Sequence, residues 1–300
     1  MVETTKKSAK KTILVTGGAG FIGSNLVERL VMDPANNVYS LDNYFTGKKE
    51  NHITGVTYIE GHTKDIATLI DFVPDVVFHL GEYSRVAQSM EEPHLVWDLN
   101  MNGTCAVLEF WRKHKFKLVY AGSSTKFSEA RADGTEGKDL SPYTWIKSAN
   151  TDLVKNYGEW YDLKYAIVYF HNVFGPRELE GKYGTVIEIF KQKYLNNEPI
   201  PMRLPGTQKR SYTSVEDTVD ALILVAEKGL GDGYGISSAK EYSTMEVAKL
   251  FKTEITMLPA RSTSRPSSTI DTTQIEALGW KATRTLEDYV NEFLAKNPRT

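Results

Sequence analysis

The chain has 300 residues, a mass of 33.8 kDa and 41% apolar side chains, enough for one large domain or two closely packed ones. This composition excludes a disordered chain, a collagen and a disulfide scaffold. Its 36 basic and 38 acidic residues give a net charge of -2, which disfavours nucleic acid as a partner. No apolar run approaches the roughly 20 residues of a membrane helix, so no membrane partner is expected.

Residues 1–11 are basic, and we expect them to form a disordered tail on a cytoplasmic protein. The single cysteine, Cys105, can form no internal disulfide, which fits a reducing compartment. One cysteine also cannot supply a zinc site, and we expect no metal.

From residue 12 onward, short β-branched segments alternate with longer segments of helical periodicity. This alternation is typical of an α/β fold, in which helices cover a doubly wound parallel sheet. The expected strands are 12–16, 38–41, 56–59, 76–80, 118–121 and 166–170. After Phe170, prolines and glycines interrupt this alternation of strand and helix segments, so a smaller second domain is expected. We predict a sheet domain over 12–170, to which 211–232 returns, and a second domain over 171–210 and 233–300.

A glycine-rich turn follows the first expected strand. Gly17, Gly20 and Gly23 are spaced GxxGxxG, with Phe21 and Ile22 between the last two, at the start of an apolar-periodic helix. Glycines there allow a tight turn and let backbone N–H groups approach a pyrophosphate at the helix N-terminus.

An acidic residue supports the same interpretation. Asp42 ends the second strand, nineteen residues after Gly23, and Asn43 follows it. A carboxylate at that place accepts hydrogen bonds from the adenosine ribose of NAD and repels the 2′-phosphate of NADP. The sequence therefore predicts a dinucleotide site, with NAD as the cofactor.

A second set of residues predicts proton transfer. Tyr143 and Lys147 are four residues apart in an expected helix that begins near Pro142, so both side chains lie on one face. A neighbouring ammonium favours a phenolate, which can remove a hydroxyl proton. Tyr44 and Lys48 repeat the spacing beside Asp42, at the adenosine end, and we interpret them as a chance match. A hydroxyl cluster at 123–125 follows another strand, and His79 is expected to be a core histidine.

Together these segments resemble the extended short-chain dehydrogenase/reductase family, specifically its NAD-dependent, UDP-glucose 4-epimerase-like nucleotide-sugar epimerases and dehydratases. TGGAGFIGSNL, LDNYFTGKKEN, SPYTWIK, VYFHNVFGPR and KRSYTSVEDTVDA occur in the family's order between Thr12 and about Trp280. The resemblance implies a Rossmann-type sheet with a smaller α/β C-terminal substrate domain. It further implies a nucleotide-diphosphate sugar, by analogy a UDP-sugar, as ligand, and a homodimer formed through helices at 101–113 and 143–160.

The resemblance also assigns roles residue by residue. Cofactor contacts are implied for Gly17, Gly20, Phe21, Ile22, Gly23, Asp42, Asn43, Leu80, Gly81, Tyr143 and Lys147. Catalytic roles are implied for Tyr143, Lys147 and Ser123, and substrate contacts for Ser123, Asn172, Arg210 and Arg265. The chain departs from the family's usual residues at His62, Gly122 and Phe127, beside the cofactor and the substrate.

The reaction depends on the two residues after Ser123. The family's 4,6-dehydratases carry an Asp-Glu pair there and its decarboxylases a glutamate at the second position, whereas this chain has Ser124 and Thr125. We therefore expect 4-epimerisation of a UDP-hexose through a transient 4-keto sugar. Dehydratase or decarboxylase chemistry is the alternative, because Glu129 or Asp133 could approach from a loop. A non-catalytic NAD-binding regulator is an alternative of another class.

Overall fold

The computed structural model describes residues 10–124, 141–170, 172–259 and 270–299. The expected disordered tail lies, up to residue 9, outside the described residues. Phe127, Glu129, Asp133 and the predicted substrate residue Arg265 lie outside them as well.

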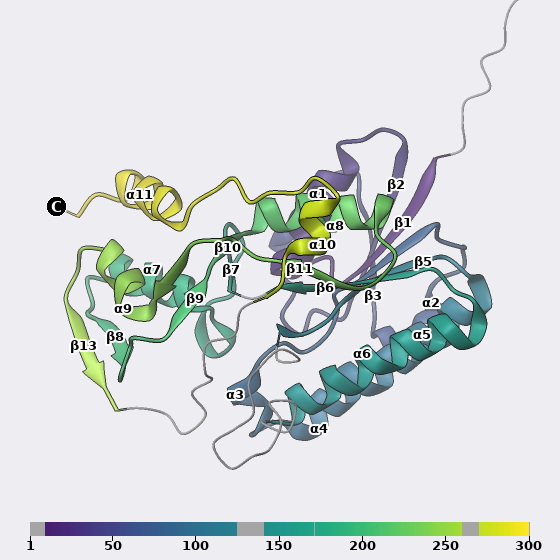
Figure 1. Ribbon diagram of the computed structural model, residues 1–300, viewed down its shortest axis with the longest axis horizontal. Coiled ribbons are helices and arrows are strands. Elements are labelled where there is room, and N and C mark those ends of the chain that lie inside the picture. The colour runs from purple at the N-terminus through teal and green to yellow at the C-terminus, as the bar shows by residue number, and fades with distance from the viewer. Residues whose placement is uncertain (1–9, 125–140, 171, 260–269, 300) are drawn as a thin grey trace, which may run out of the picture.

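A seven-stranded sheet forms the centre of the molecule, in the order β11-β6-β5-β4-β1-β2-β3 (Figure 1). All its pairings are parallel. The strands are β1 (Lys11–Thr16), β2 (Asn36–Asp42), β3 (Thr57–Glu60), β4 (Val76–His79), β5 (Lys117–Ala121), β6 (Tyr165–Phe170) and β11 (Gly231–Ile236). This order is that of a doubly wound nucleotide-binding fold, and the predicted fold class is confirmed. The strand β11 was not predicted from the sequence, because its glycines weaken the strand pattern.

Helices cover both faces of the sheet because alternate strand residues face opposite ways. Ile13 and Val15 of β1 pack in one core, whereas Leu14 packs in the other. The first core includes side chains of α1 (Phe21–Val31) and α8 (Val215–Lys228). The second core includes side chains of α2 (Ile66–Leu69), α5 (Gly103–His114) and α6 (Pro142–Tyr161). Two short helices, α3 (Val86–Ser89) and α4 (Pro93–Val96), precede α5.

A separate core lies beyond the sheet, where Figure 1 shows α7, α9 and α11 grouped with short strands. Phe190, Phe251 and Val290 belong to this core. Its elements are α7 (Val186–Leu195), β8 (Ile200–Arg203), β9 (Lys209–Ser211), β12 (Glu241–Ser243), α9 (Thr244–Leu250), β13 (Ile255–Leu258) and α11 (Leu286–Lys296). Two short paired strands, β7 (Val173–Phe174) and β10 (Thr213–Ser214), connect the sheet with this separate core.

The sheet domain and the separate core both contain residues from the C-terminal part of the chain. α8 packs on β5 and β6, and β11 extends the sheet to Ile236, beyond the boundary expected at 232. The helix α10 (Thr273–Ala277) packs on β11, and Trp280 belongs to the first core. Within the described part of the chain, no helix combines the length and the apolar character that a membrane span requires.

Candidate active site

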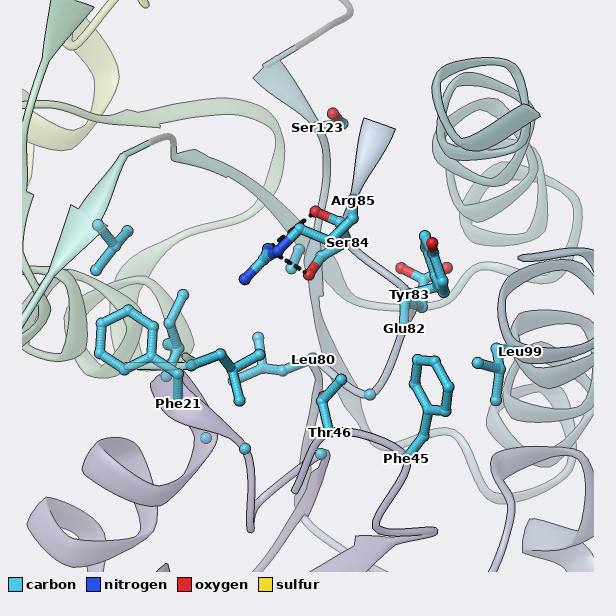
Figure 2. Close-up of a pocket in the computed structure, with 18 of the residues that line it drawn as sticks. Phe21, Phe45, Thr46, Leu80, Glu82, Tyr83, Ser84, Arg85, Leu99 and Ser123 are labelled. Atoms are coloured by element: carbon cyan, nitrogen blue, oxygen red, sulfur yellow. Dashed lines mark hydrogen bonds between the residues drawn. The ribbon is translucent and has the colours of Figure 1, made fainter. Parts of the chain in front are cut away.

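A cavity of about 450 Å³ lies at the carboxyl ends of the central strands (Figure 2). Its wall includes Gly17 after β1, Asp42 at the end of β2, Leu80 after β4, Ala121 at the end of β5 and Phe170 at the end of β6. Ligands of doubly wound sheets bind at this edge. Residues in and near the separate core beyond the sheet close the cavity on the other side, among them Thr185, Ile187 and Tyr212.

The glycine turn brings the backbone close to the cavity. Gly17 has a φ of +74°, and a Cβ there would lie 2.8 Å from the Cα of Gly81. A Cβ on Gly23 would overlap the carbonyl oxygen of Gly17, so no larger residue fits. Gly20 precedes α1 and no side chain caps this helix, so the first-turn N–H groups remain available to a ligand anion.

The second predicted cofactor group, Asp42, lies on the same cavity wall. Its Oδ2 accepts the N–H of Ala19 at 2.9 Å and its Oδ1 accepts the N–H of Tyr44 at 2.8 Å. Burial raises the pKa of the Asp42 carboxyl, and these two donors oppose the rise. Each oxygen keeps a further acceptor position, which suits a pair of ribose hydroxyls. The glycine turn and this carboxylate therefore fit a dinucleotide.

The predicted catalytic residues gather at the other end of the cavity, where Tyr143, Lys147 and Ser123 all line the wall. Pro142 opens α6 behind a Ser141–Thr144 capping box, so the predicted helix start is confirmed. The Tyr143 hydroxyl lies 3.4 Å from Ser123 Oγ and donates to it. A phenol and a hydroxyl so placed can hold one substrate oxygen between them.

The ammonium of Lys147 has partners that were not predicted from the sequence. It forms an ion pair with Glu82, and both side chains are only 4% exposed. It also donates to the Tyr120 hydroxyl at 2.8 Å and to the carbonyl oxygen of Ala121 at 2.5 Å. Lys147 is therefore a buried, charge-compensated cation.

Glu82 is held as an anion. Its Oε1 accepts hydrogen bonds from Thr104 at 2.8 Å, Asn150 at 2.9 Å and Tyr120 at 3.3 Å. Burial acts to raise the pKa of Glu82, but the charge of Lys147 and the hydrogen bonds from Lys147 and Thr104 outweigh it and hold the pKa below its ordinary value. A carboxylate with this many donors is a poor general acid.

A hydrogen-bond chain connects Glu82 to the glycine turn through His79. Thr16 Oγ1 accepts the N–H groups of Leu80 at 3.2 Å and Gly81 at 3.0 Å, which occupy both of its lone pairs. Its own proton therefore points to His79 Nδ1 at 2.7 Å. His79 Nε2 then donates to Thr104 Oγ1 at 3.0 Å, and Thr104 donates to Glu82. This order needs a neutral imidazole, and burial lowers the pKa of His79 to about 4.

The His79 shift predicts a pH-dependent stability. An unfolded histidine titrates near pH 6.5, so the unfolded chain binds the proton first and stability falls as pH drops from 6.5 toward 4. We expect His79 to account for roughly 2 to 3 kcal/mol of the loss between pH 7.5 and 4.5. Urea unfolding of the wild type and of His79→Gln at both pH values measures this contribution. Equal losses in the two proteins would contradict it.

The structure places the predicted substrate residues unequally. Asn172 lines the cavity and donates to the carbonyl oxygen of Ser211 at 3.0 Å. Arg210 lies on β9, two residues before the lining residue Tyr212, and is not itself on the cavity wall. Burial lowers the pKa of the Arg210 guanidinium. His62 caps a short 3-10 turn by accepting the N–H of Lys64 at 2.9 Å.

Two charged residues on the cavity wall, Glu82 and Arg85, were not predicted from the sequence. Both residues follow the strand that ends at His79. Ligands of such sheets bind just past the carboxyl ends of the strands, so their position in the sequence could have identified them as site residues. The cavity consequently holds more charge than predicted.

Comparison with known proteins gives the family. The model of the NAD dependent epimerase/dehydratase family matches residues 13–236. A putative UDP-glucose 4-epimerase of Methanocaldococcus jannaschii is 31% identical over 306 aligned residues, which cover 96% of this chain and 100% of that protein. A UDP-N-acetyl-alpha-D-glucosaminuronate decarboxylase of Bacillus cytotoxicus is 33% identical over 255 residues, 80% of this chain and 79% of that protein.

A solved structure agrees with this assignment. The UDP-glucose 4-epimerase of Thermus thermophilus in complex with NAD matches with a TM-score of 0.85 and 28% identity, over 96% of this chain and 100% of that one. The glycine turn, Asp42 and the sheet order fit the cofactor that this family uses. The chain thus belongs to the NAD-dependent epimerase/dehydratase family and has NAD as its cofactor.

Proposed function

We propose that this chain is a 4-epimerase of a UDP-linked hexose and works through a transient 4-keto sugar. The observation that carries the proposal is the Tyr143–Ser123 hydroxyl pair at one end of the cavity, with no acidic residue directly after Ser123. NAD, when bound, accepts the C4 hydride and returns it. Tyr143 takes the C4 hydroxyl proton and Ser123 orients that hydroxyl. Lys147 lines the same cavity wall, where its ammonium is held in place by Glu82.

The charges of the site favour epimerisation over dehydration. Loss of the C6 hydroxyl needs a proton donor, and the position after Ser123 is a buried serine, Ser124, that lines the cavity. Glu82 is ionised and fully occupied by its donors. The residues present therefore provide for proton transfer at the C4 oxygen and for no further elimination, which is what inversion at C4 would require of the protein.

Decarboxylation is the second candidate, since the relative from Bacillus cytotoxicus is named as the decarboxylase of a uronic acid. A non-catalytic regulator is disfavoured because Tyr143, Ser123 and Lys147 are all present on one cavity wall. The proposed sugar nucleotide would meet Asn172, with Arg210 and Arg265 as further candidates for its diphosphate.

The proposal includes a cytoplasmic homodimer formed through α5 and α6. Large aromatic side chains on and beside α6 are exposed, among them Trp160 at 62%. Trp97 and Trp145 stack on each other at the surface, with ring centroids 6.5 Å apart. Burial of this apolar surface against a second copy would stabilise a dimer.

The direct test is a panel of UDP-, GDP- and dTDP-sugars incubated with the purified protein and followed by proton NMR. We expect a pair of C4 epimers of a UDP-sugar to equilibrate without added cofactor. A 4-keto-6-deoxy product would establish a dehydratase instead, and release of CO2 from a uronic acid would establish a decarboxylase.

A further inference from the structure

Arg85 is a cation on the wall of the cavity, and the proposed mechanism does not use it. Its Nε donates to the carbonyl oxygen of Tyr183 at 2.7 Å. Its Nη1 donates to the carbonyl oxygen and the Oγ of Ser84, at 3.1 and 3.0 Å. Figure 2 shows the guanidinium held by Ser84 and pointing into the cavity. These three bonds fix the plane of the group.

Among the residues that the structure describes, no carboxylate forms an ion pair with Arg85. Burial lowers the pKa of Arg85, and the charges of Tyr143 and Glu178 oppose this. Glu178 lies close enough to influence the pKa of Arg85 but forms no ion pair with it. Its carboxyl instead accepts hydrogen bonds from the N–H of Gly175, at 2.9 Å, and from the Thr185 hydroxyl.

Among the described residues, the carboxylates on the cavity wall itself are Glu82 and Asp42, and neither pairs with Arg85. Glu82 pairs with Lys147, and Asp42 binds two backbone N–H groups. A partly buried cation without a counter-ion is unfavourable, and a ligand anion in the cavity would relieve that cost. The guanidinium fork matches a carboxylate or a phosphate.

The position of Arg85 favours a carboxylate close to the reacting carbon. The N-terminus of α1 already provides for the cofactor's phosphates, and Arg210 and Arg265 are the candidates for the sugar nucleotide's diphosphate. Arg85, in contrast, lines the same cavity as Tyr143, whose phenol takes the proton of the C4 hydroxyl in the proposed reaction, and the two groups interact electrostatically. In a hexuronic acid the C6 carboxylate is attached to C5, next to C4.

We propose that Arg85 binds the C6 carboxylate of a nucleotide-linked hexuronic acid, so that the preferred substrate is a uronic acid and not a neutral hexose. This inference rests on the proposed function, because it takes C4 as the reacting centre. Arg85 is then a specificity-determining residue. Nε, bonded to Tyr183, and Nη1, bonded to Ser84, keep the group in place, and the N–H groups of Nη2 are left for the ligand.

Binding measurements test this without relying on turnover. In a Tyr143→Phe background loaded with NAD, the dissociation constants of UDP-glucuronate, UDP-glucose and UDP are measured by calorimetry. We expect UDP-glucuronate to bind about tenfold or more tightly than UDP-glucose, the size of one charge-assisted hydrogen-bond pair. Adding Arg85→Gln should remove that preference and leave UDP-glucose within about threefold, whereas Arg85→Lys should keep part of it.

Arg29→Gln is the matched control, because Arg29 is a surface residue in a 2.7 Å ion pair with Asp220 and its loss removes the same charge. It should leave all three dissociation constants unchanged. Equal weakening of both sugars and of UDP by Arg85→Gln would assign Arg85 to the diphosphate and overturn the proposal. Loss of NAD alone would assign it to the cofactor, and unchanged binding would make its role structural; each result also overturns the proposal.

The NMR panel separates this inference from the proposed function. If the carboxylate preference depends on Arg85 but no sugar is epimerised, the Arg85 assignment stands and the 4-epimerase assignment fails. If UDP-hexoses are epimerised while Arg85→Gln changes no dissociation constant, the Arg85 assignment fails alone. Melting temperature and bound NAD content, measured for every variant, show that each protein is folded.

Discussion

Replacing Tyr143 with phenylalanine is expected to lower kcat by about 10²- to 10⁴-fold, the range attributed to a positioned general acid or base. The change removes only the hydroxyl, which in the structure lies 3.4 Å from Ser123 Oγ. The ring is buried, so its packing in α6 should persist and the protein should remain folded with NAD bound. The measurement is the initial rate of C4 inversion, followed by NMR under saturating substrate.

The chain supplies a matched control in its second Tyr-x-x-x-Lys sequence. The Tyr44 hydroxyl bonds His52 at 2.9 Å, and the side chain is not on the cavity wall. Tyr44→Phe should therefore leave kcat within about twofold of the wild type. Turnover by Tyr143→Phe at the wild-type rate would contradict the assignment of Tyr143 as a catalytic residue. An equal loss of kcat in both variants would show that the effect is not specific to the site.

Glu82→Ala is expected to destabilise the fold by about 3 to 5 kcal/mol, because the Lys147 ammonium would be left buried without its counter-charge. Three further donors, from Thr104, Asn150 and Tyr120, would lose their acceptor. Chemical denaturation, with the free energy of unfolding extrapolated to zero denaturant, measures the loss. Glu82→Gln keeps the shape and one acceptor oxygen and should cost less.

A double variant tests whether charge compensation is the cause. Glu82→Gln combined with Lys147→Met removes both charges. This double variant should be more stable than Lys147→Met alone, because the single variant leaves the buried carboxylate of Glu82 without its counter-charge. Glu60→Ala removes a glutamate from an exposed 3.0 Å pair with Lys49, and little change is expected there. A Glu82→Ala protein as stable as Glu60→Ala would contradict the compensated pair.

These two variants probe residues that differ in how well the sequence predicted them. Tyr143 was found because Pro142, the four-residue spacing and an apolar periodicity are all local to one helix. Glu82 was not found because its significance depends on Lys147, 65 residues later in the chain. No spacing rule connects two positions that only the packing of α6 against the sheet brings together.

The same distinction applies to the substrate side of the cavity. Arg210 was assigned by resemblance alone, and the structure places it beside the cavity wall and not on it. Arg85 lies on the wall, although it belongs to none of the motifs recognised in the sequence. Its bond to Ser84 is local, but its bond to the carbonyl oxygen of Tyr183 joins residues 98 positions apart and depends on the tertiary structure.

The sequence by itself determined the α/β class, six of the central strands, the glycine turn and the acidic residue at the end of β2. These features follow from rules of short range: alternation of strand residues, helical periodicity and the absence of a Cβ where backbones meet. Only the tertiary structure decided that β11 completes the sheet, that Lys147 is paired with Glu82 and that Arg85, on the cavity wall, has no carboxylate partner among the described residues. The physical reason is that pairing and burial are properties of residues distant in sequence, and their energies are set by the packing that surrounds them.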